Sequence, residues 1–301
     1  MSVIKNVAIT GASGALGKPI LDAILNSGKF NVTVLTRASS KGQFPSSVKV
    51  VPVDFDSVES LTAALKGQDA VVSAVGTEGF PGQNIVVDAA VAAGVKRFLP
   101  SEFGSDLDNP KTKTLPVFGY KVAVAAHIEE VASKNPEFSY TYVRNGPFLD
   151  WGLEHNFLFD LASGKPRIFD GGDQLFSTTT LETVGRAVVG VLSKPEETKN
   201  RAVYIQDLTT SQNRILALAK EVAPEKSFEP VPASLDDVYQ SSNEKLSKGE
   251  VTMEVMVGYL FVSILKEGYG GKMEKTDNEL LGLGQKTEED IKAILRKLLK
   301  K

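Results

Sequence analysis

Three glycines near the N-terminus have a spacing that points to phosphate chemistry. Gly11, Gly14 and Gly17 follow a short apolar run and precede a helical apolar pattern. Glycines at this spacing allow a tight turn and a close approach of the backbone to a pyrophosphate, and a helix N-terminus favours negative charge. We therefore predict a dinucleotide site with Ser13 and Leu16 among its contacts. A glycine turn that binds no ligand is the alternative.

The end of the second predicted strand indicates which dinucleotide binds. An NAD site usually has an acidic residue there, which binds the two ribose hydroxyls. Here Arg37 is followed by Lys41, and two cations suit a 2′-phosphate, so the sequence favours NADP(H) over NAD(H). An exposed arginine without a ligand is the alternative. By fold position, Asp54 is expected beside the adenine, and Val75 and Gly76 beside the nicotinamide ribose.

Short β-branched runs alternate with stretches of helical period through the first half of the chain. The runs fall at 6–10, 31–37, 48–54, 69–75, 96–102 and 140–146, and the helical stretches at 17–28, 57–68, 82–94 and 120–134. This alternation predicts a Rossmann-type, doubly wound parallel α/β sheet with helices on both faces. We expect an NADP-binding domain at 1–147 and a smaller, interleaved C-terminal α/β substrate lobe at 148–301, with residues about 176–208 returning to the sheet.

Composition excludes several classes of function. The 301 residues carry a net charge of −3 without a basic block, so no nucleic-acid partner is expected. The longest apolar run, MVGYLFVSIL, is about half of a membrane span, and the start of the sequence lacks an export signal, so no membrane partner and a cytoplasmic location are expected. The absence of cysteine excludes thiol nucleophiles, and with only His127 and His155 no metal centre is expected. A monomer or a homodimer is expected.

Four motifs carry a resemblance to a known family. GASGALG, VLTR, FLPSEFGSD and VFGYK stand in this order along the chain. Together they resemble the NmrA-like, isoflavone reductase-like group of atypical short-chain dehydrogenases, with phenylcoumaran benzylic ether reductases and pinoresinol-lariciresinol reductases among its members. The resemblance covers about residues 3–151, and it implies that Lys121 is the general acid/base.

The residues around Lys121 fit that role only in part. Ordinary short-chain dehydrogenases have a tyrosine four residues before the lysine, whereas Tyr120 is adjacent to Lys121 and points about 100° away on a helix. A lysine beside a dry cleft has its pKa lowered to about 7–8, which suits proton exchange. A solvated helix lysine is the alternative. Lignan reductases carry a basic residue one turn later, where this sequence has Ala125, which leaves the substrate open.

Further contacts are expected at the carboxyl edge of the sheet. Glu102 and Phe103 follow the fifth strand, although a polar pair at a strand end can also serve only to cap a turn. The resemblance places Asn145 and Phe148 beside the nicotinamide. The expected substrate wall consists of His155 and five aromatic residues, each of which can instead belong to the core: Phe80, Phe103, Trp151, Phe157 and Tyr259.

These residues support two hypotheses of different classes. The first is an NADPH-dependent reductase of a small aromatic or polyketide-like substrate, with hydride from NADPH and a proton relayed by Lys121. The reduced bond is left open among a carbonyl, an enone and a benzylic ether. The second is an NmrA-type regulatory protein that senses NADP(H) or NAD(H) without turnover, which would explain the missing tyrosine–lysine pair.

Overall fold

The computed structural model describes residues 3–157 and 159–299. The strands are β1 Asn6–Thr10, β2 Asn31–Arg37, β3 Lys49–Val53, β4 Ala70–Ser73, β5 Arg97–Leu99, β6 Ser139–Arg144, β7 Arg167–Phe169, β8 Phe176–Thr178, β9 Arg201–Tyr204, β10 Leu208–Thr210 and β11 Val231–Ala233. The helices are α1 Gly17–Ser27, α2 Val58–Leu65, α3 Gln83–Ala92, α4 Pro110–Lys113, α5 Gly119–Lys134, α6 Leu149–Glu154, α7 Leu181–Ser193, α8 Gln212–Val222, α9 Leu235–Ser247, α10 Met253–Leu265 and α11 Glu288–Leu299, with short 3-10 helices η1 Thr77–Gly79 and η2 Pro116–Phe118.

Seven strands form one parallel sheet in the order β3-β2-β1-β4-β5-β6-β9. Strand β1 lies in the middle, where Val7 pairs with Val32 of β2 and with Ala70 of β4. The chain order reverses between β1 and β4, and ligands of such sheets bind at the carboxyl ends of the strands beside this reversal. The predicted Rossmann-type fold class is confirmed.

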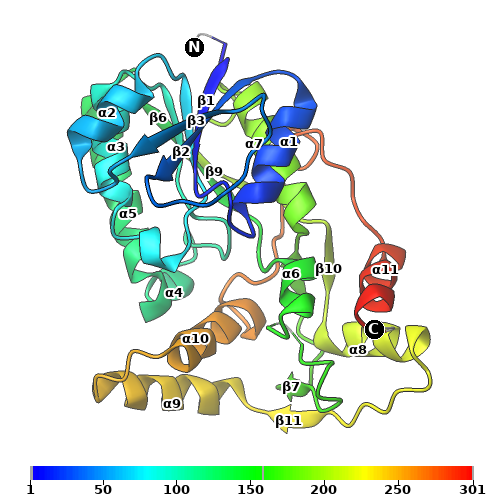
Figure 1. Cartoon of the computed structure of the whole chain (residues 1–301). Coiled ribbons are helices and arrows are strands. Elements are labelled where there is room, and N and C mark those ends of the chain that lie inside the picture. The colour runs from blue at the N-terminus through cyan, green and yellow to red at the C-terminus, as the bar shows by residue number, and fades with distance from the viewer. Residues whose placement is uncertain (1–2, 158, 300–301) are drawn as a thin grey trace.

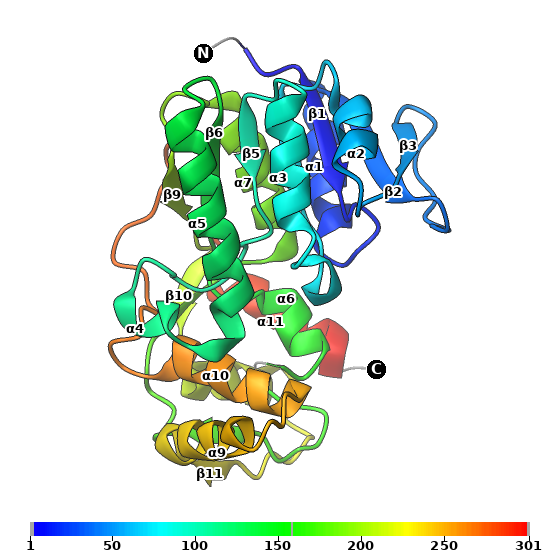
Figure 2. The same ribbon diagram turned by 90° about the vertical axis from the view of Figure 1, so that its left-hand side faces the viewer.

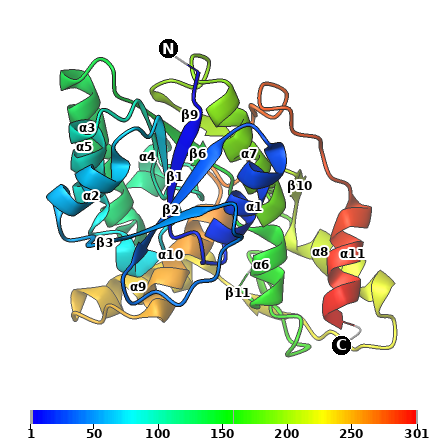
Figure 3. The ribbon, with the colours of Figure 1, turned by 45° about the horizontal axis from the view of Figure 1, so that its top comes forward.

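Helices cover both faces of the sheet because the strands bury side chains on both sides. Val7 and Ile9 of β1 pack into a cluster with Ile20 of α1 and Val188 of α7, whereas Ala8 between them packs into a cluster on the other face. This alternation follows from the two-residue period of a strand. Helices α1 and α7 lie on one face, and α2, α3 and α5 lie on the other (Figures 1 and 3).

Helix α7 belongs to the sheet although it follows the first predicted domain in sequence. It packs closely along α1, because Gly185 has no side chain at the contact: a Cβ there would lie 2.6 Å from the carbonyl oxygen of Pro19. Strand β9 likewise adds to the sheet edge beside β6. The domain boundary at residue 147 stays a prediction, since the chain crosses between the two parts more than once.

A second, mainly helical part lies beyond the carboxyl ends of the strands, with α9 and α10 packed together and α11 beside α8 (Figures 2 and 3). Two short strand pairs, antiparallel β8 with β10 and parallel β7 with β11, are separate from the seven-stranded sheet. Its core contains Phe169, Leu218, Phe261 and Leu295. Within the described ranges, no helix combines the length and the apolar character that crossing a membrane requires.

Candidate functional site

The ends of β1, β4 and β5 form one continuous edge. The loop after β1 approaches the segment after β4 so closely that a Cβ at Gly11 would lie 2.6 Å from the carbonyl carbon of Ala74. After β5, the Ser101 hydroxyl donates to the carbonyl oxygen of Val75 at 2.7 Å. Residues predicted from three separate motifs therefore meet at the carboxyl edge, beside the point where the strand order reverses.

Glycine is needed at the three positions of the first loop for different structural reasons. Gly11 has φ +73° beside Ala74, and a Cβ on Gly17 would lie 2.7 Å from the carbonyl carbon of Gly11. Packing therefore explains both residues without any ligand. A Cβ on the exposed Gly14 would meet only the carbonyl oxygen of Gly11, at 3.3 Å. Gly14 is thus the glycine that the folded chain itself requires least, and it leaves the loop open to solvent.

The start of α1 is prepared for an anion. Its N-cap residue Leu16 offers no side-chain hydrogen bond, and the first turn contains no acidic residue. The Lys18 N–H donates to the Gly14 carbonyl at 3.0 Å and Pro19 has no N–H, so attraction of a phosphate would depend on the helix dipole and on the N–H groups before Lys18. Leu16 packs against the core, while Ser13 is exposed on the outer side of the loop.

The segment after β2 lies against this loop. Arg37 ends β2 with an exposed side chain, and Lys41 is exposed four residues later. A Cβ on Gly42 would lie 3.3 Å from the Cβ of Ser13, so the segment that carries Lys41 returns to the glycine loop. Asp54 lies at the end of β3, where its carboxylate accepts the N–H of Asp56 at 3.0 Å. That carboxylate is therefore already engaged in a local turn.

Lys121 lies at the same edge, in the first turn of α5. Its ammonium donates to the main-chain carbonyl of Glu102 and lies 5.5 Å from the centre of the Phe80 ring. Gly104 borders it, since a Cβ there would lie 3.6 Å from the Lys121 Nζ. Burial lowers the pKa of Lys121 from 10.5 to about 8; the nearby Glu102 raises it and Arg144 lowers it further. The side chain is half-buried, so this is not an ordinary solvated helix lysine.

Glu102 does not face the expected cofactor position with its carboxylate. That carboxylate forms a buried ion pair with Arg144, the last residue of β6, and only the Glu102 carbonyl faces Lys121. Phe103 follows with φ +23°, an unusual backbone conformation for a residue with a side chain, and its ring packs into the core. Arg144 was not among the residues predicted from the sequence, although a charged residue at the end of a strand was a signal for it.

The end of β6 brings two further predicted residues to this edge. The Asn145 N–H donates to the carbonyl oxygen of Gly104 at 3.1 Å, next to Lys121. The Asn145 amide is fully buried, and its Oδ1 has no hydrogen-bond partner among the described residues. Phe148 packs against the same apolar cluster as Leu16. These contacts join the end of β6 to the loop beside Lys121 and to the apolar cluster that also contains Leu16.

The predicted substrate wall is only partly brought together. Phe80 contacts Lys121, whereas Trp151 stacks on His155 at 4.5 Å between ring centres and lies 6.2 Å from Phe157. Those three residues form a separate cluster at α6. Tyr259 is fully buried in α10, and its hydroxyl donates to Asn243 at 2.8 Å. The structure therefore places Tyr259 in the core at α10, and its role in the substrate wall stays a prediction.

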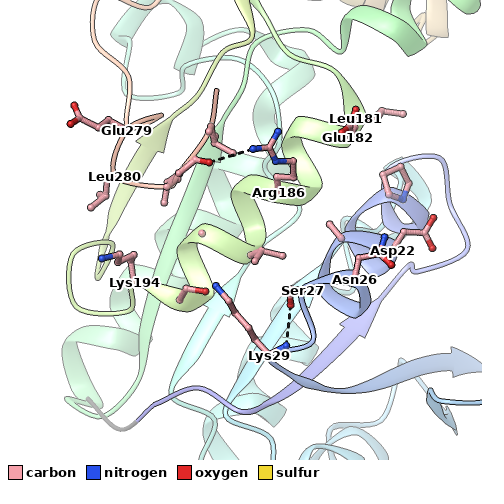
Figure 4. A pocket seen from close by; sticks show the side chains of 18 of the residues that line it. Asp22, Asn26, Ser27, Lys29, Leu181, Glu182, Arg186, Lys194, Glu279 and Leu280 are labelled. Carbon is pink, nitrogen blue, oxygen red and sulfur yellow. Dashed lines mark hydrogen bonds between the residues drawn. The ribbon is translucent and has the colours of Figure 1, made fainter. Parts of the chain in front are cut away.

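A hollow of about 1050 Å³ lies away from this edge, between α1, α7 and residues 279–283. Figure 4 shows charges of both signs around it, among them Asp22, Lys29 and Glu182. Arg186 donates to the carbonyl oxygen of Gly282 at 3.3 Å across one side. None of its lining residues belongs to the predicted site. We therefore assign the chemistry to the carboxyl edge rather than to this hollow.

Comparisons with known proteins agree with the fold. A model of the NmrA-like family matches residues 4–244. Oxidoreductase aprR of Aspergillus flavus is 36% identical over 300 residues, which covers 97% of this chain and 98% of that protein. Isoflavone reductase homolog A622 of Nicotiana glauca is 27% identical over 258 residues, covering 79% and 80%. A solved structure described as AtPrR2 with NADP+ and (+)pinoresinol has a TM-score of 0.80 and 23% identity, covering 99% of this chain and all of that chain.

Proposed function

The chain belongs to the NmrA-like family, and from that premise we propose that it is an NADP(H)-dependent reductase of a small aromatic or polyketide-like molecule. The observation that carries the proposal is the position of Lys121. Its ammonium is half-buried at the carboxyl edge of a Rossmann-type sheet, between the Glu102 carbonyl and the Phe80 ring. A solvated surface lysine keeps its ordinary pKa, whereas burial lowers the pKa of Lys121 to about 8.

The residues at the edge fit a dinucleotide. The open loop at Gly14 and the uncapped start of α1 suit its pyrophosphate. The exposed cations of Arg37 and Lys41 suit a 2′-phosphate. The unpartnered Oδ1 of Asn145 is a buried acceptor that lacks a donor, and the carboxamide of a nicotinamide carries such donors. The similar structure that holds NADP+ supports the same choice.

When bound, NADPH supplies the hydride, and the protein has to supply a proton. With a pKa of about 8, Lys121 carries a proton at pH 7 but releases it far more readily than an ordinary lysine. The Glu102 carbonyl and the Phe80 ring hold the ammonium at the cleft side of α5. Lys121 then donates to the oxygen that develops negative charge on a carbonyl, an enone or a benzylic ether, and recovers a proton from water.

An aromatic substrate is favoured by the side chains around this edge. Phe80 is half-buried next to Lys121, and Trp151 and His155 offer a stacked pair at α6. Flat rings pack well against such surfaces. The proteins similar to this chain include an isoflavone reductase homolog and a structure solved with pinoresinol, both consistent with an aromatic substrate.

The test follows NADPH oxidation with a panel of isoflavones, lignan-type dimers, aryl ketones and quinones. Wild type is compared with Lys121→Ala and with Lys134→Ala, an exposed lysine at the other end of the same helix. We expect Lys121→Ala to bind NADPH like wild type but to turn over about a hundredfold more slowly or worse, within the usual range for a lost general acid. Lys134→Ala should stay near wild type. If all three proteins bind NADPH tightly and none of them oxidises it with any substrate of the panel, the reductase is refuted and the sensing protein is favoured.

A further inference from the structure

Glu102 and Arg144 form a buried ion pair beside Lys121. Each of the two side chains is only 2% exposed. Arg144 also lies 3.5 Å from the Asp108 carboxylate and 5.1 Å from the centre of the Tyr142 ring, and its Nε has no partner among the described residues. A buried ion pair is often no more stabilising than apolar residues of the same volume. Its presence next to the proposed proton donor therefore needs a reason other than stability.

The two oxygen-bearing groups of Glu102 have different partners. Its carboxylate binds Arg144, while its main-chain carbonyl accepts from Lys121. The loop is fixed in this orientation from β6, because the Gly104 carbonyl accepts the N–H groups of Asn145 at 3.1 Å and of Gly146 at 3.0 Å. Lys121 thus faces a neutral carbonyl although a carboxylate belongs to the same residue.

We propose that Arg144 is a positioning residue that holds the Glu102 carboxylate away from Lys121, so that the ammonium stays on the Glu102 carbonyl and remains able to transfer its proton. This inference rests on the proposed function of Lys121. Without Arg144, the buried carboxylate would have Lys121 as its nearest cationic partner. An ammonium paired with a carboxylate keeps its proton more firmly and is tethered away from a substrate.

The surrounding charges define the expected directions. Glu102 and Arg144 are the charged groups that act on Lys121, in opposite directions: the carboxylate raises its pKa and the guanidinium lowers it. Farther out, Asp106 and Asp108 both accept from the Tyr204 hydroxyl at 3.0 Å, and Asp108 faces Arg144. Removing Arg144 should therefore raise the pKa of Lys121, and removing Glu102 should lower it. Removing both should leave the pKa nearly unchanged, because the two effects oppose each other.

The experiment measures the pKa of Lys121 directly. The lysines are reductively methylated with 13C-formaldehyde, the Lys121 signal is assigned with Lys121→Arg, and its shift is followed with pH by NMR. We expect the pKa to rise by about one unit or more in Arg144→Met and to fall in Glu102→Gln, as for loss of a charge within contact distance. Arg144→Lys, which keeps the positive charge, should restore most of the wild-type value. The double variant Glu102→Gln/Arg144→Met should titrate close to wild type.

The outcomes separate this inference from the function on which it rests. Opposite shifts in the two single variants support the role of Arg144, and an unchanged Lys121 pKa in both overturns it. If Arg144→Met does not fold, the nearly isosteric Glu102→Gln is the remaining test. A lowered Lys121 pKa in that variant supports the inference, and an unchanged pKa overturns it. The pH profile of kcat should move with the NMR titration while KM changes little. Absence of NADPH oxidation by wild type would instead count against the proposed function. The NMR titration would still show whether Glu102 and Arg144 set the pKa of Lys121.

Discussion

Replacing Lys121 with methionine should make the protein more stable at neutral pH. The side chain keeps a similar length but loses a charge whose burial lowers the pKa from 10.5 to about 8. At about 1.4 kcal/mol per pH unit, this difference corresponds to about 3 kcal/mol. Solvent at the partly exposed side chain screens part of it, and the lost contacts with the Phe80 ring and the Glu102 carbonyl together remove about 1–2 kcal/mol. We expect a net gain of about 1 kcal/mol for Lys121→Met at pH 7.

The gain should disappear as the pH rises. Between pH 8 and 10.5 the unfolded wild-type chain binds a proton at Lys121 that the folded chain does not, so the stability of the wild type increases with pH. The advantage of Lys121→Met must shrink over the same window. Urea unfolding at pH 7 and at pH 9.5 measures both values. Lys134→Met on the exposed end of α5 is the control and should change stability by less than about 0.5 kcal/mol. Equal stability of Lys121→Met and wild type at pH 7 would refute the desolvation of this lysine.

Two further predictions concern cofactor binding. Arg37→Ala should lower the NADPH to NADH affinity ratio about tenfold or more, because a hydrogen bond to a charged group contributes about 1.5–3 kcal/mol; fluorescence titration measures both affinities, and an unchanged ratio would exclude Arg37 from the site. Gly17→Ala should strongly lower the melting temperature, since its Cβ would lie 2.8 Å from the Ala12 Cα, whereas Gly14→Ala should melt near wild type and yet bind NADPH more weakly. An equal decrease in melting temperature for Gly17→Ala and Gly14→Ala would contradict the assignment of a packing role to Gly17 and a binding role to Gly14.

The sheet was predictable because its signal is local and repeated. The run 31–37 coincides with β2, and the helical stretch 17–28 with α1, which ends one residue earlier. The central strands β1 and β4 consist mostly of apolar residues because both of their faces are covered. The resemblance in VFGYK pointed to Lys121, and its place near the carboxyl edge agrees with the position of α5 between β5 and β6 in the chain.

Side-chain partners were not predictable in the same way. Glu102 and Arg144 are 42 residues apart in sequence, and nothing in either motif specifies that the carboxylate turns toward β6 while the carbonyl turns toward α5. Tyr259 shows the same limit: its residue type does not distinguish a core position from a cleft position, and in the structure the packing of α10 buries it while Asn243 accepts from its hydroxyl. Tertiary contacts decide between a core and a pocket position, and the spacing along the chain does not contain them.

Several unfavourable features of this fold lie near the ends of β5 and β6. Phe103 has a positive φ, Lys121 has a lowered pKa, and the adjacent residues Arg144 and Asn145 each carry one of the six buried side-chain polar atoms that lack a partner in the described part of the chain. Strain and unsatisfied groups of this kind persist where the surrounding structure holds them, and they concentrate at functional sites. The apolar clusters on both faces of the sheet supply that support. Because these features all adjoin the ends of β5 and β6, they support the proposed site at this edge.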